Sequence, residues 1–398
     1  MKIVFVNPVG VIGGAERVLL TILAALLNQQ SDIKLHLIVG TDGPLIEKAQ
    51  KLGVQVTLLQ LPEEFNQLGD SAFKGRNKAI GLLILLLRLT KILPGIGKYL
   101  GEFRRSLREL QPDLIHSNGI KTHLLIALVG IKDTPVIWHI HDFYGSRPLI
   151  AKVLKLKFIN YCAKLGIAIS QAVAQDAKTT LPQLPIKIIY NAVDINYFFP
   201  IPSSPNLPLR VGLVATFARW KGHDIFLEAA SEIIKTHPDL NVRFDIVGGA
   251  IYKTRGSQFS EQELKDKAAY LNIADKVNFL GFQEDIAAVY RDLDIVVHAS
   301  TQPEPFGLAI VEAMACGKPV IVSQAGGAVE LFTHNYDAVG VSPGEPKALA
   351  AAILDLLNHP EKRHTLSEQA RHTVTERFSH ERLGKQLMEV YKLVLDSQ

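Results

Sequence analysis

The stretch EPFGLAIVEAMACGKPV spans residues 304–320. A Pro-Phe-Gly turn leads into a run with helical spacing, so we expect a helix that starts near Phe306 and presents free backbone N–H groups, which suit a phosphate. Glu304 lies in the loop before this helix and Glu312 lies inside it. Carboxylates accept hydrogen bonds from vicinal hydroxyls, so Glu304 suits a sugar and Glu312 a ribose. Each glutamate alone has a structural explanation, but the combination favours a ligand site.

Outward from this helix, short β-rich runs alternate with longer helical patterns. This alternation predicts βαβ units and a parallel sheet with helices on both faces. It is interrupted by PIPSSPNLP at residues 200–208, where four prolines in nine residues indicate an extended linker. We therefore expect an α/β protein with two Rossmann-like domains that face each other across a cleft, a common ligand site. The expected domains are residues 1–197 and 209–378, and a helix over 379–398 is expected to return to the first domain.

The expected elements follow this alternation through both domains. The strands are Lys2–Asn7, Lys34–Val39, Val54–Leu58, Asp113–His116, Val136–His141, Gly166–Ile169, Ile186–Tyr190, Leu209–Thr216, Val242–Val247, Val277–Leu280, Ile295–Ala299 and Pro319–Val322. The helices are Gly14–Leu27, Leu45–Leu52, His223–Lys235, Glu261–Leu271, Glu361–Arg377 and Glu381–Leu395.

The composition is that of an ordinary globular protein, with 398 residues, 47% apolar and 21% charged. The two cysteines, Cys162 and Cys316, exclude a disulfide framework and a cysteine-rich metal site, and they fit a reducing cytosol. A net charge of +4 is too small to indicate nucleic-acid binding. Residues 1–200 hold 23 Lys and Arg against 14 Asp and Glu, so this half is expected to meet an anionic ligand or lipid surface.

No signal peptide or membrane span is expected. The chain opens with MKIVFV, which predicts a strand, and the longest apolar run, Ala79–Leu87, has nine residues where a span needs about 20. Residues 74–108 hold nine Lys and Arg with Glu102 as their one acidic residue, around apolar Ala79–Leu93. Such a segment can lie on an anionic membrane, and a buried helix with solvated flanks is the alternative. We expect a cytoplasmic protein, with peripheral membrane contact through residues 74–108 as an open possibility.

A glycine-rich loop, GVIGGAE at residues 10–16, follows the first strand and opens the first helix. Gly13 and Gly14 would let backbone N–H groups approach an anion, and a plain tight turn is the alternative. The spacing is not G-x-G-x-x-G, which disfavours a dinucleotide-dependent dehydrogenase.

Two further motifs lie at the ends of expected strands. HIHD at residues 139–142 places His139 and His141 on the same face of a strand. No third zinc ligand is apparent, so contact between a histidine and substrate is favoured over metal binding, and a packed histidine is the alternative. ARWKGH at residues 218–223 places Arg219 and Lys221 before a helix, where two cations suit a diphosphate, and a solvated loop is the alternative.

Together these motifs resemble those of the group 1 (family 4) retaining glycosyltransferases of the GT-B fold. The spacing of Glu304 and Glu312 matches the family's E-x7-E motif. Further segments resemble, in family order, the N-terminal glycine loop (Gly13-Gly14), the DvvH strand (residues 113–116), the acceptor-side histidine motif (His141-Asp142), the NGVD turn (residues 190–194) and the GG..E turn (Gly326, Gly327 and Glu330). The resemblance covers nearly the whole chain, and the ordered set is specific although no single piece is.

The resemblance implies transfer of a sugar from a nucleotide-sugar donor to a glycan or lipid-linked acceptor, in cell-surface polysaccharide or glycolipid synthesis. The donor is a substrate, and neither a cofactor nor a metal is expected. The implied catalytic residues are Glu304 at the donor-sugar hydroxyls, Lys221 and Arg219 at the diphosphate, and His141 near the transferred sugar. The implied donor-binding residues are Glu312 at the ribose, the amides of Phe306, Gly307 and Leu308 at sugar and phosphate, and Gly13, Gly14 and Thr216.

The sequence departs from the family pattern at two positions. Thr216 stands where the family usually has an arginine that helps to neutralise the diphosphate, and our hypothesis is that Arg219 replaces it. Ala192 stands where a glycine is usual, which is expected to change only the geometry of a turn. Asp292 and Asp294 match the metal-binding D-x-D motif of a different glycosyltransferase fold, but they precede a buried strand, so a capping role is favoured.

Two other functions stay open. Sugar-nucleotide 2-epimerases share this architecture, although the E-x7-E pattern together with Lys221 favours transfer. A non-catalytic nucleotide-sugar-binding protein is the second alternative, and the intact Glu304, Glu312 and Lys221 argue against it.

Overall fold

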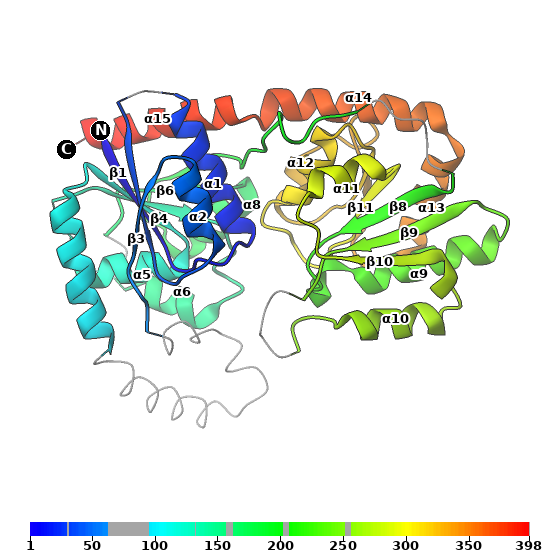
Figure 1. Ribbon diagram of the computed structural model, residues 1–398, viewed down its shortest axis with the longest axis horizontal. Coiled ribbons are helices and arrows are strands. Elements are labelled where there is room, and N and C mark those ends of the chain that lie inside the picture. Colours follow the sequence, from blue (N-terminus) through cyan, green and yellow to red (C-terminus); the bar gives the residue numbers. More distant parts are fainter. Residues whose placement is uncertain are drawn as a thin grey trace. The chain divides into compact units, whose positions relative to one another are not determined.

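The computed structural model divides the chain into two compact units, Met1–Ala192 with His380–Gln398, and Val193–Ser379 (Figure 1). The structure describes residues 1–29, 32–62, 95–131, 133–156, 162–201, 207–250 and 256–397. Each unit is built on a parallel sheet with helices packed against it. The prediction of two Rossmann-like α/β domains is therefore confirmed.

The first unit contains a seven-stranded sheet in the order β3-β2-β1-β4-β5-β6-β7, with every pair parallel. Its strands are β1 (Lys2–Asn7), β2 (Lys34–Val39), β3 (Gln55–Leu58), β4 (Leu114–Asn118), β5 (Val136–Ile140), β6 (Leu165–Ala168) and β7 (Ile186–Ile188). The central strands β4 and β5 are buried along their whole length, as strands covered on both faces must be. The strand order reverses between β1 and β4, so polar residues at the carboxyl ends of these strands are well placed to meet a ligand.

Helices of the first unit cover both faces of this sheet. They are α1 (Gly14–Leu27), α2 (Pro44–Lys51), α5 (Ile120–Val129), α6 (Pro148–Leu154), α8 (Gln171–Thr180) and α15 (His380–Asp396), and residues 95–110 are also helical. In the part of the chain that the structure describes, every helix is too short or too polar to span a bilayer. Residues 63–94, which include most of the basic segment 74–108, lie outside the described residues.

The C-terminal helix α15 packs against α1, the first helix of the chain (Figure 1). Gly384 permits this close approach, because a Cβ atom there would lie 2.8 Å from the carbonyl oxygen of Ala25. Further along α15, the buried Tyr391 hydroxyl lies 2.8 Å from Nδ1 of His116 on β4. The last helix is therefore an integral part of the first unit.

The second unit contains a six-stranded parallel sheet in the order β10-β9-β8-β11-β12-β13. Its strands are β8 (Leu209–Val214), β9 (Val242–Val247), β10 (Val277–Gly281), β11 (Ile295–His298), β12 (Val320–Ser323) and β13 (Val339–Val341). Its helices are α9 (His223–Thr236), α10 (Glu261–Tyr270), α11 (Ile286–Asp292), α12 (Leu308–Ala315), α13 (Pro346–Asn358) and α14 (Pro360–Arg377). Helix α9 packs with α10 and α13, and α12 packs with α11 and α14 (Figure 1). The chain runs outward from β8 through β9 to β10 on one side of the sheet and from β11 through β12 to β13 on the other. Because each crossover between parallel strands is right-handed, the helices of these two halves lie on opposite faces of the sheet.

The chain leaves the first unit at Ala192, ahead of the proline-rich stretch. Arg371 on α14 accounts for this, because its guanidinium donates hydrogen bonds to the carbonyl oxygens of Ile195 and Phe198. Phe198 is buried, and its ring lies 6.2 Å from that of Tyr290. The segment before the prolines is therefore fixed to the second unit, while residues 202–206 lie outside the described residues.

Candidate active site

In the second unit, Glu304 is the centre of a buried polar cluster. One of its carboxylate oxygens, Oε2, lies 2.7 Å from the Lys221 ammonium, 3.0 Å from the Ser300 hydroxyl and 3.2 Å from Nε2 of His298. Burial by itself raises the pKa of Glu304, but the Lys221 ammonium and the contact with His298 outweigh it and hold that pKa well below its usual range. Glu304 is therefore a carboxylate at neutral pH, only 7% exposed and fixed in direction.

Lys221 reaches Glu304 because its short 3-10 turn, Arg219–Lys221, is fastened to the end of β11. Gly222 has a φ of +75°, and a Cβ atom there would collide with the carbonyl oxygen of Ala299. The Thr301 amide donates a hydrogen bond of 2.8 Å to the carbonyl oxygen of Trp220. The Lys221 ammonium also lies 4.2 Å from the centre of the Trp220 ring, a cation–π contact.

The loop that carries Glu304 is held from the other side by the Gly326-Gly327 turn. Glu304 and Gly326 form a parallel β-bridge, and the Gly327 amide donates a hydrogen bond of 2.6 Å to the Glu304 carbonyl oxygen. Gly326 has a φ of +67°, and a Cβ atom there would lie 2.5 Å from the same oxygen. A side chain at this position would displace the Glu304 backbone, which explains the glycine.

Helix α12 begins directly after this loop, at Leu308, with Gly307 as its N-cap at a φ of +109°. Phe306 is buried and packs edge-on against Phe378, which anchors the turn in the apolar core. The Phe306 side chain is thus structural, so any ligand contact from this residue would come through its backbone. The predicted start of the helix, near Phe306, is correct to within two residues.

Glu312 is buried on the second turn of α12, where the Tyr290 hydroxyl donates a hydrogen bond of 3.1 Å to its Oε2. The hydrogen bond from Tyr290 fixes the orientation of the Glu312 carboxylate, just as Lys221, Ser300 and His298 fix that of Glu304. Two oriented carboxylates and the N-terminus of α12 thus belong to one segment of the second unit.

Arg219 and Thr216 are placed differently from these residues. The exposed Arg219 guanidinium forms a 2.6 Å ion pair with Glu263 on α10 and lies over the Phe259 ring at 4.3 Å. Backbone hydrogen bonding by Ser260, together with Arg219, lowers the pKa of Glu263 to about 2. Thr216 is half-buried just beyond β8. The structure does not bring Arg219 into the Glu304 cluster, so its replacement of the family arginine remains a hypothesis.

In the first unit, Gly13 is the N-cap of α1, and Gly14 is its first residue. The Gly13 amide already donates a hydrogen bond of 3.0 Å to the carboxylate of Glu16. His141 follows β5, and its Nε2 lies 2.7 Å from Oδ1 of Asn118, at the end of β4. Burial lowers the pKa of His141 to about 4, with Asp142 acting weakly in the opposite direction, so the ring is neutral at pH 7.

His298 and Ser300 belong to the Glu304 cluster, although neither was predicted as a site residue. His298 lies near the carboxyl end of the predicted strand Ile295–Ala299 and Ser300 directly follows that strand, so the two residues, two apart, are expected on one face. That position, six and four residues ahead of Glu304, was the signal available in the sequence. A histidine at the end of a buried strand is usually a packing residue, which is why the signal was weak.

No metal centre is found among the residues that the structure describes. The aspartates of the D-x-D motif serve the fold instead. Asp294 accepts a hydrogen bond of 2.8 Å from the Arg210 amide at the start of β8, and Asp292 lies 3.6 Å from the Arg210 guanidinium.

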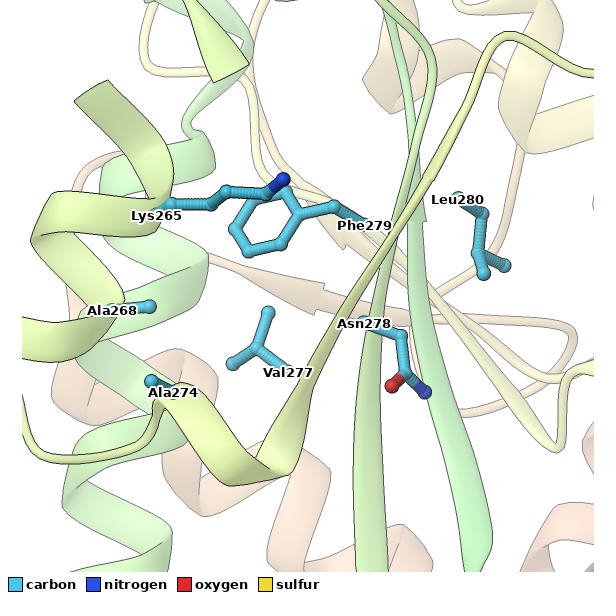
Figure 2. Close-up of a pocket in the computed structure, with 7 residues that line it drawn as sticks. All are labelled: Lys265, Ala268, Ala274, Val277, Asn278, Phe279 and Leu280. Carbon is cyan, nitrogen blue, oxygen red and sulfur yellow. The ribbon is translucent and has the colours of Figure 1, made fainter. Parts of the chain in front are cut away.

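Figure 2 shows a separate pocket in the second unit, formed by α10, the 3-10 turn Ala274–Lys276 and the edge strand β10. The Lys265 ammonium lies 5.7 Å from the centre of the Phe279 ring in this pocket. The remaining lining residues are Ala268, Ala274, Val277, Asn278 and Leu280. None of the candidate site residues lines it, so we do not assign it to the site.

Comparison with known proteins is consistent with this geometry. The sequence-family model described as glycosyl transferases group 1 matches residues 198–373, and the family model of glycosyltransferase family 4 matches residues 12–197. The chain is 27% identical to an uncharacterized glycosyltransferase of Methanocaldococcus jannaschii, covering 71% of this chain and 76% of the relative. It is 32% identical to the D-inositol 3-phosphate glycosyltransferase of Corynebacterium urealyticum, over 46% of this chain and 42% of the relative.

Among solved structures, HepE of Anabaena in complex with UDP matches with a TM-score of 0.79 and 26% identity, covering 99% of this chain and 100% of HepE. The two family models together span nearly the whole chain, and this structural match extends over both units. On this evidence the chain belongs to the group 1, family 4 glycosyltransferases of the GT-B fold.

Proposed function

We propose that the protein transfers a sugar from a nucleotide-sugar donor to a glycan or lipid-linked acceptor, with retention of configuration at the anomeric carbon. The observation that carries the proposal is the Lys221–Glu304 ion pair just ahead of α12, with Glu312 buried on that helix. HepE has been crystallised with UDP, with UDP and glucose, and with UDP-glucose, which supports a UDP-sugar as the donor.

In this proposal the donor diphosphate meets the Lys221 ammonium and the backbone N–H groups at the start of α12. Negative charge develops on the diphosphate as its bond to the sugar breaks, and oriented donors stabilise that charge best in a site from which water is excluded. Glu304, ionised and held by three donors through one oxygen, accepts hydrogen bonds from the sugar hydroxyls. Glu312 accepts hydrogen bonds from the ribose.

The acceptor hydroxyl attacks the anomeric carbon on the face from which the diphosphate departs, which retains the configuration. The departing phosphate oxygen takes the hydroxyl proton, so charge and protons balance without a covalent intermediate on the protein. The chain contributes the placement of both substrates and the stabilisation of the leaving group. Neither a metal nor a cofactor is part of this proposal.

A thermal-shift panel of UDP, GDP and ADP, each with and without EDTA, tests donor binding. A ligand that binds only the folded state raises the melting temperature. We expect UDP to stabilise the protein in EDTA, Glu312→Ala to abolish the shift, and Glu368→Ala, on an exposed face of α14, to leave it unchanged. Failure of every nucleotide to stabilise at millimolar concentration would refute the donor site.

Product analysis separates transfer from the alternative activities. Incubation with UDP-sugar and acceptor is expected to give UDP and a glycoside whose anomeric proton coupling matches that of the donor. An inverted glycoside would refute retention. Formation of an epimeric UDP-sugar without acceptor would establish the 2-epimerase alternative, and binding without any product would establish the non-catalytic one.

A lipid-linked acceptor would suit the basic segment, residues 74–108, at the cytoplasmic face of a membrane. The support is the excess of Lys and Arg in that segment. Co-sedimentation is expected with vesicles that contain anionic lipid and not with neutral vesicles. Equal sedimentation with both would count against membrane contact.

A further inference from the structure

Four polar side chains of the first unit form a continuous hydrogen-bonded chain from the glycine loop to His141. The Glu16 carboxylate lies 3.3 Å from Nδ2 of Asn7, Oδ1 of Asn7 lies 2.7 Å from Nδ2 of Asn118, and Oδ1 of Asn118 lies 2.7 Å from Nε2 of His141. Glu16, Asn7 and Asn118 are all buried. We call this set the asparagine relay.

The relay occupies the place where the sheet reverses its strand order. Asn7 ends β1 and Asn118 ends the neighbouring strand β4, while His141 follows β5. Such carboxyl ends are where ligands bind in open parallel sheets. Burying two asparagine side chains costs free energy, because each amide must be desolvated, so packing alone does not account for them; what they gain is a set of directed hydrogen bonds that ends at His141.

The orientation of the Asn7 amide determines the direction of every hydrogen bond in the relay. Nδ2 of Asn7 lies 2.6 Å from the Val9 carbonyl oxygen, which can only accept, and 3.3 Å from Oε1 of Glu16. Oδ1 of Asn7 must therefore accept from Asn118, which turns the Asn118 oxygen toward His141. An amide oxygen cannot donate, so Nε2 of His141 must carry the proton.

A neutral imidazole with its proton on Nε2 has Nδ1 as its one acceptor nitrogen. Burial lowers the pKa of His141, which keeps the ring neutral at pH 7 and preserves this arrangement. Asp142 raises that pKa, and Arg147 lies 3.1 Å from Asp142. The ring of His139, a titratable neighbour whose own pKa burial holds well below its usual value, lies 4.1 Å from that of His141.

We propose that Glu16, Asn7 and Asn118 are positioning residues that fix His141 in the Nε2–H tautomer, so that Nδ1 accepts a hydrogen bond from a substrate hydroxyl. The proposal rests on the proposed function for the identity of that hydroxyl as a sugar hydroxyl. The tautomer itself depends only on contacts within the first unit. Glu16 has a second part in the relay, since its other oxygen accepts the Gly13 amide and so ties α1 to the same chain.

The tautomer is measured directly by two-bond ¹H–¹⁵N correlation spectra of the full-length protein labelled with ¹⁵N-histidine, with His141→Gln to assign the signal. We expect a fixed Nε2–H tautomer for His141 between pH 6 and pH 8, without donor or acceptor. A fixed Nδ1–H tautomer, a mixture of the two, or a charged ring in this range would overturn the proposal.

Two substitutions at position 118 separate positioning from general stability. Asn118→Leu removes the acceptor, so His141 should become a mixture of tautomers and kcat should fall by about tenfold or more while the UDP affinity is kept. Asn118→Asp keeps the acceptor beside Nε2 and adds charge, so the tautomer should persist and the pKa of His141 should rise. Asn28→Leu, at the exposed C-cap of α1, is the matched control and should change neither readout. An unchanged His141 signal in Asn118→Leu would refute the relay.

The two proposals fail in different ways. If the tautomer is fixed as expected and no sugar is transferred, the relay stands and the proposed function is wrong. If transfer occurs and the tautomer is not Nε2–H, the function stands and the relay is wrong.

Discussion

Lowering the pH from 7.5 to 5.5 is expected to destabilise the first unit by about 4 kcal/mol, because three of its histidines are buried in neutral form. His116, His123 and His139 are at most 2% exposed. Burial lowers the pKa of His116 to about 3 and places those of His123 and His139 well below the ordinary value of 6.5. Below pH 6.5 the unfolded chain therefore binds protons at these histidines that the folded unit does not bind.

The sign follows from proton binding. Above pH 6.5 these rings are neutral in both states and their full stabilisation is present, and below pH 6.5 only the unfolded state takes up protons, so stability falls with pH. Each ring loses about 1.4 kcal/mol between pH 7.5 and pH 5.5, which gives about 4 kcal/mol for three. The figure of about 4 kcal/mol counts these three rings only; His141, whose pKa burial lowers to about 4, adds about 1.4 kcal/mol by the same arithmetic. His36, whose pKa burial also lowers, adds further to the loss, and Glu16, whose pKa burial raises, acts in the opposite direction.

Urea unfolding followed by tryptophan fluorescence is the assay. The chain has two tryptophans, Trp138 in the first unit and Trp220 in the second, so a Trp220→Phe background reports the first unit alone. With a slope of about 2.5 kcal/mol per molar urea, the midpoint should fall by about 1.5 M. His123→Phe, which keeps the stacking on Trp138, should reduce the pH-dependent loss by about 1.4 kcal/mol. A loss below about 1 kcal/mol, or an unchanged pH dependence in His123→Phe, would refute the reasoning.

Three further predictions concern the Glu304 cluster. Lys221→Ala should lower kcat, measured by UDP release, by about 100-fold or more, because it removes the cation at the leaving group. The control Lys235→Ala, at the exposed end of α9, should leave kcat unchanged. Glu304→Gln should abolish transfer. Calorimetry should show UDP affinity that is unchanged or up to about fivefold higher, because an ion pair worth about 1 kcal/mol no longer holds Lys221 away from the diphosphate. A lower UDP affinity would contradict this prediction. Gly326→Ala should lower stability by about 1–3 kcal/mol and reduce activity, because its Cβ displaces the Glu304 backbone, while Gly249→Ala, which meets nothing within 4 Å, should be neutral in thermal unfolding.

Much of the fold could be predicted from local patterns. The predicted bounds of β1, β2 and β9 agree with the structure, because each is a short β-rich run covered on both faces. Strand β13 was missed since it has three residues, too few for a period to show. Helix α13 was also missed, although Pro346 at its N-terminus and the spacing of Leu349, Ile353 and Leu356 were readable signals.

The site could be predicted only in part. Residue types and spacing identified Glu304, Glu312 and Lys221, but no local pattern shows that Lys221 and Glu304, 83 residues apart, form one ion pair. The contact between Asn7 and Asn118 spans 111 residues and was not predicted at all. Asparagines at strand ends are usually turn residues, so only the strand order of the folded sheet makes the relay visible.

The packing of α15 against α1 has a consequence for how the chain is made. The first unit is assembled from both ends of the sequence, and His116 in its sheet obtains the Tyr391 hydroxyl as a partner only from the last helix. During synthesis, the second unit, which is continuous in sequence, is complete before the first unit has its final helix. The packing of the first unit can therefore be completed only after residues 193–379 have been synthesised, because α1 and His116 obtain their contacts with α15 only then.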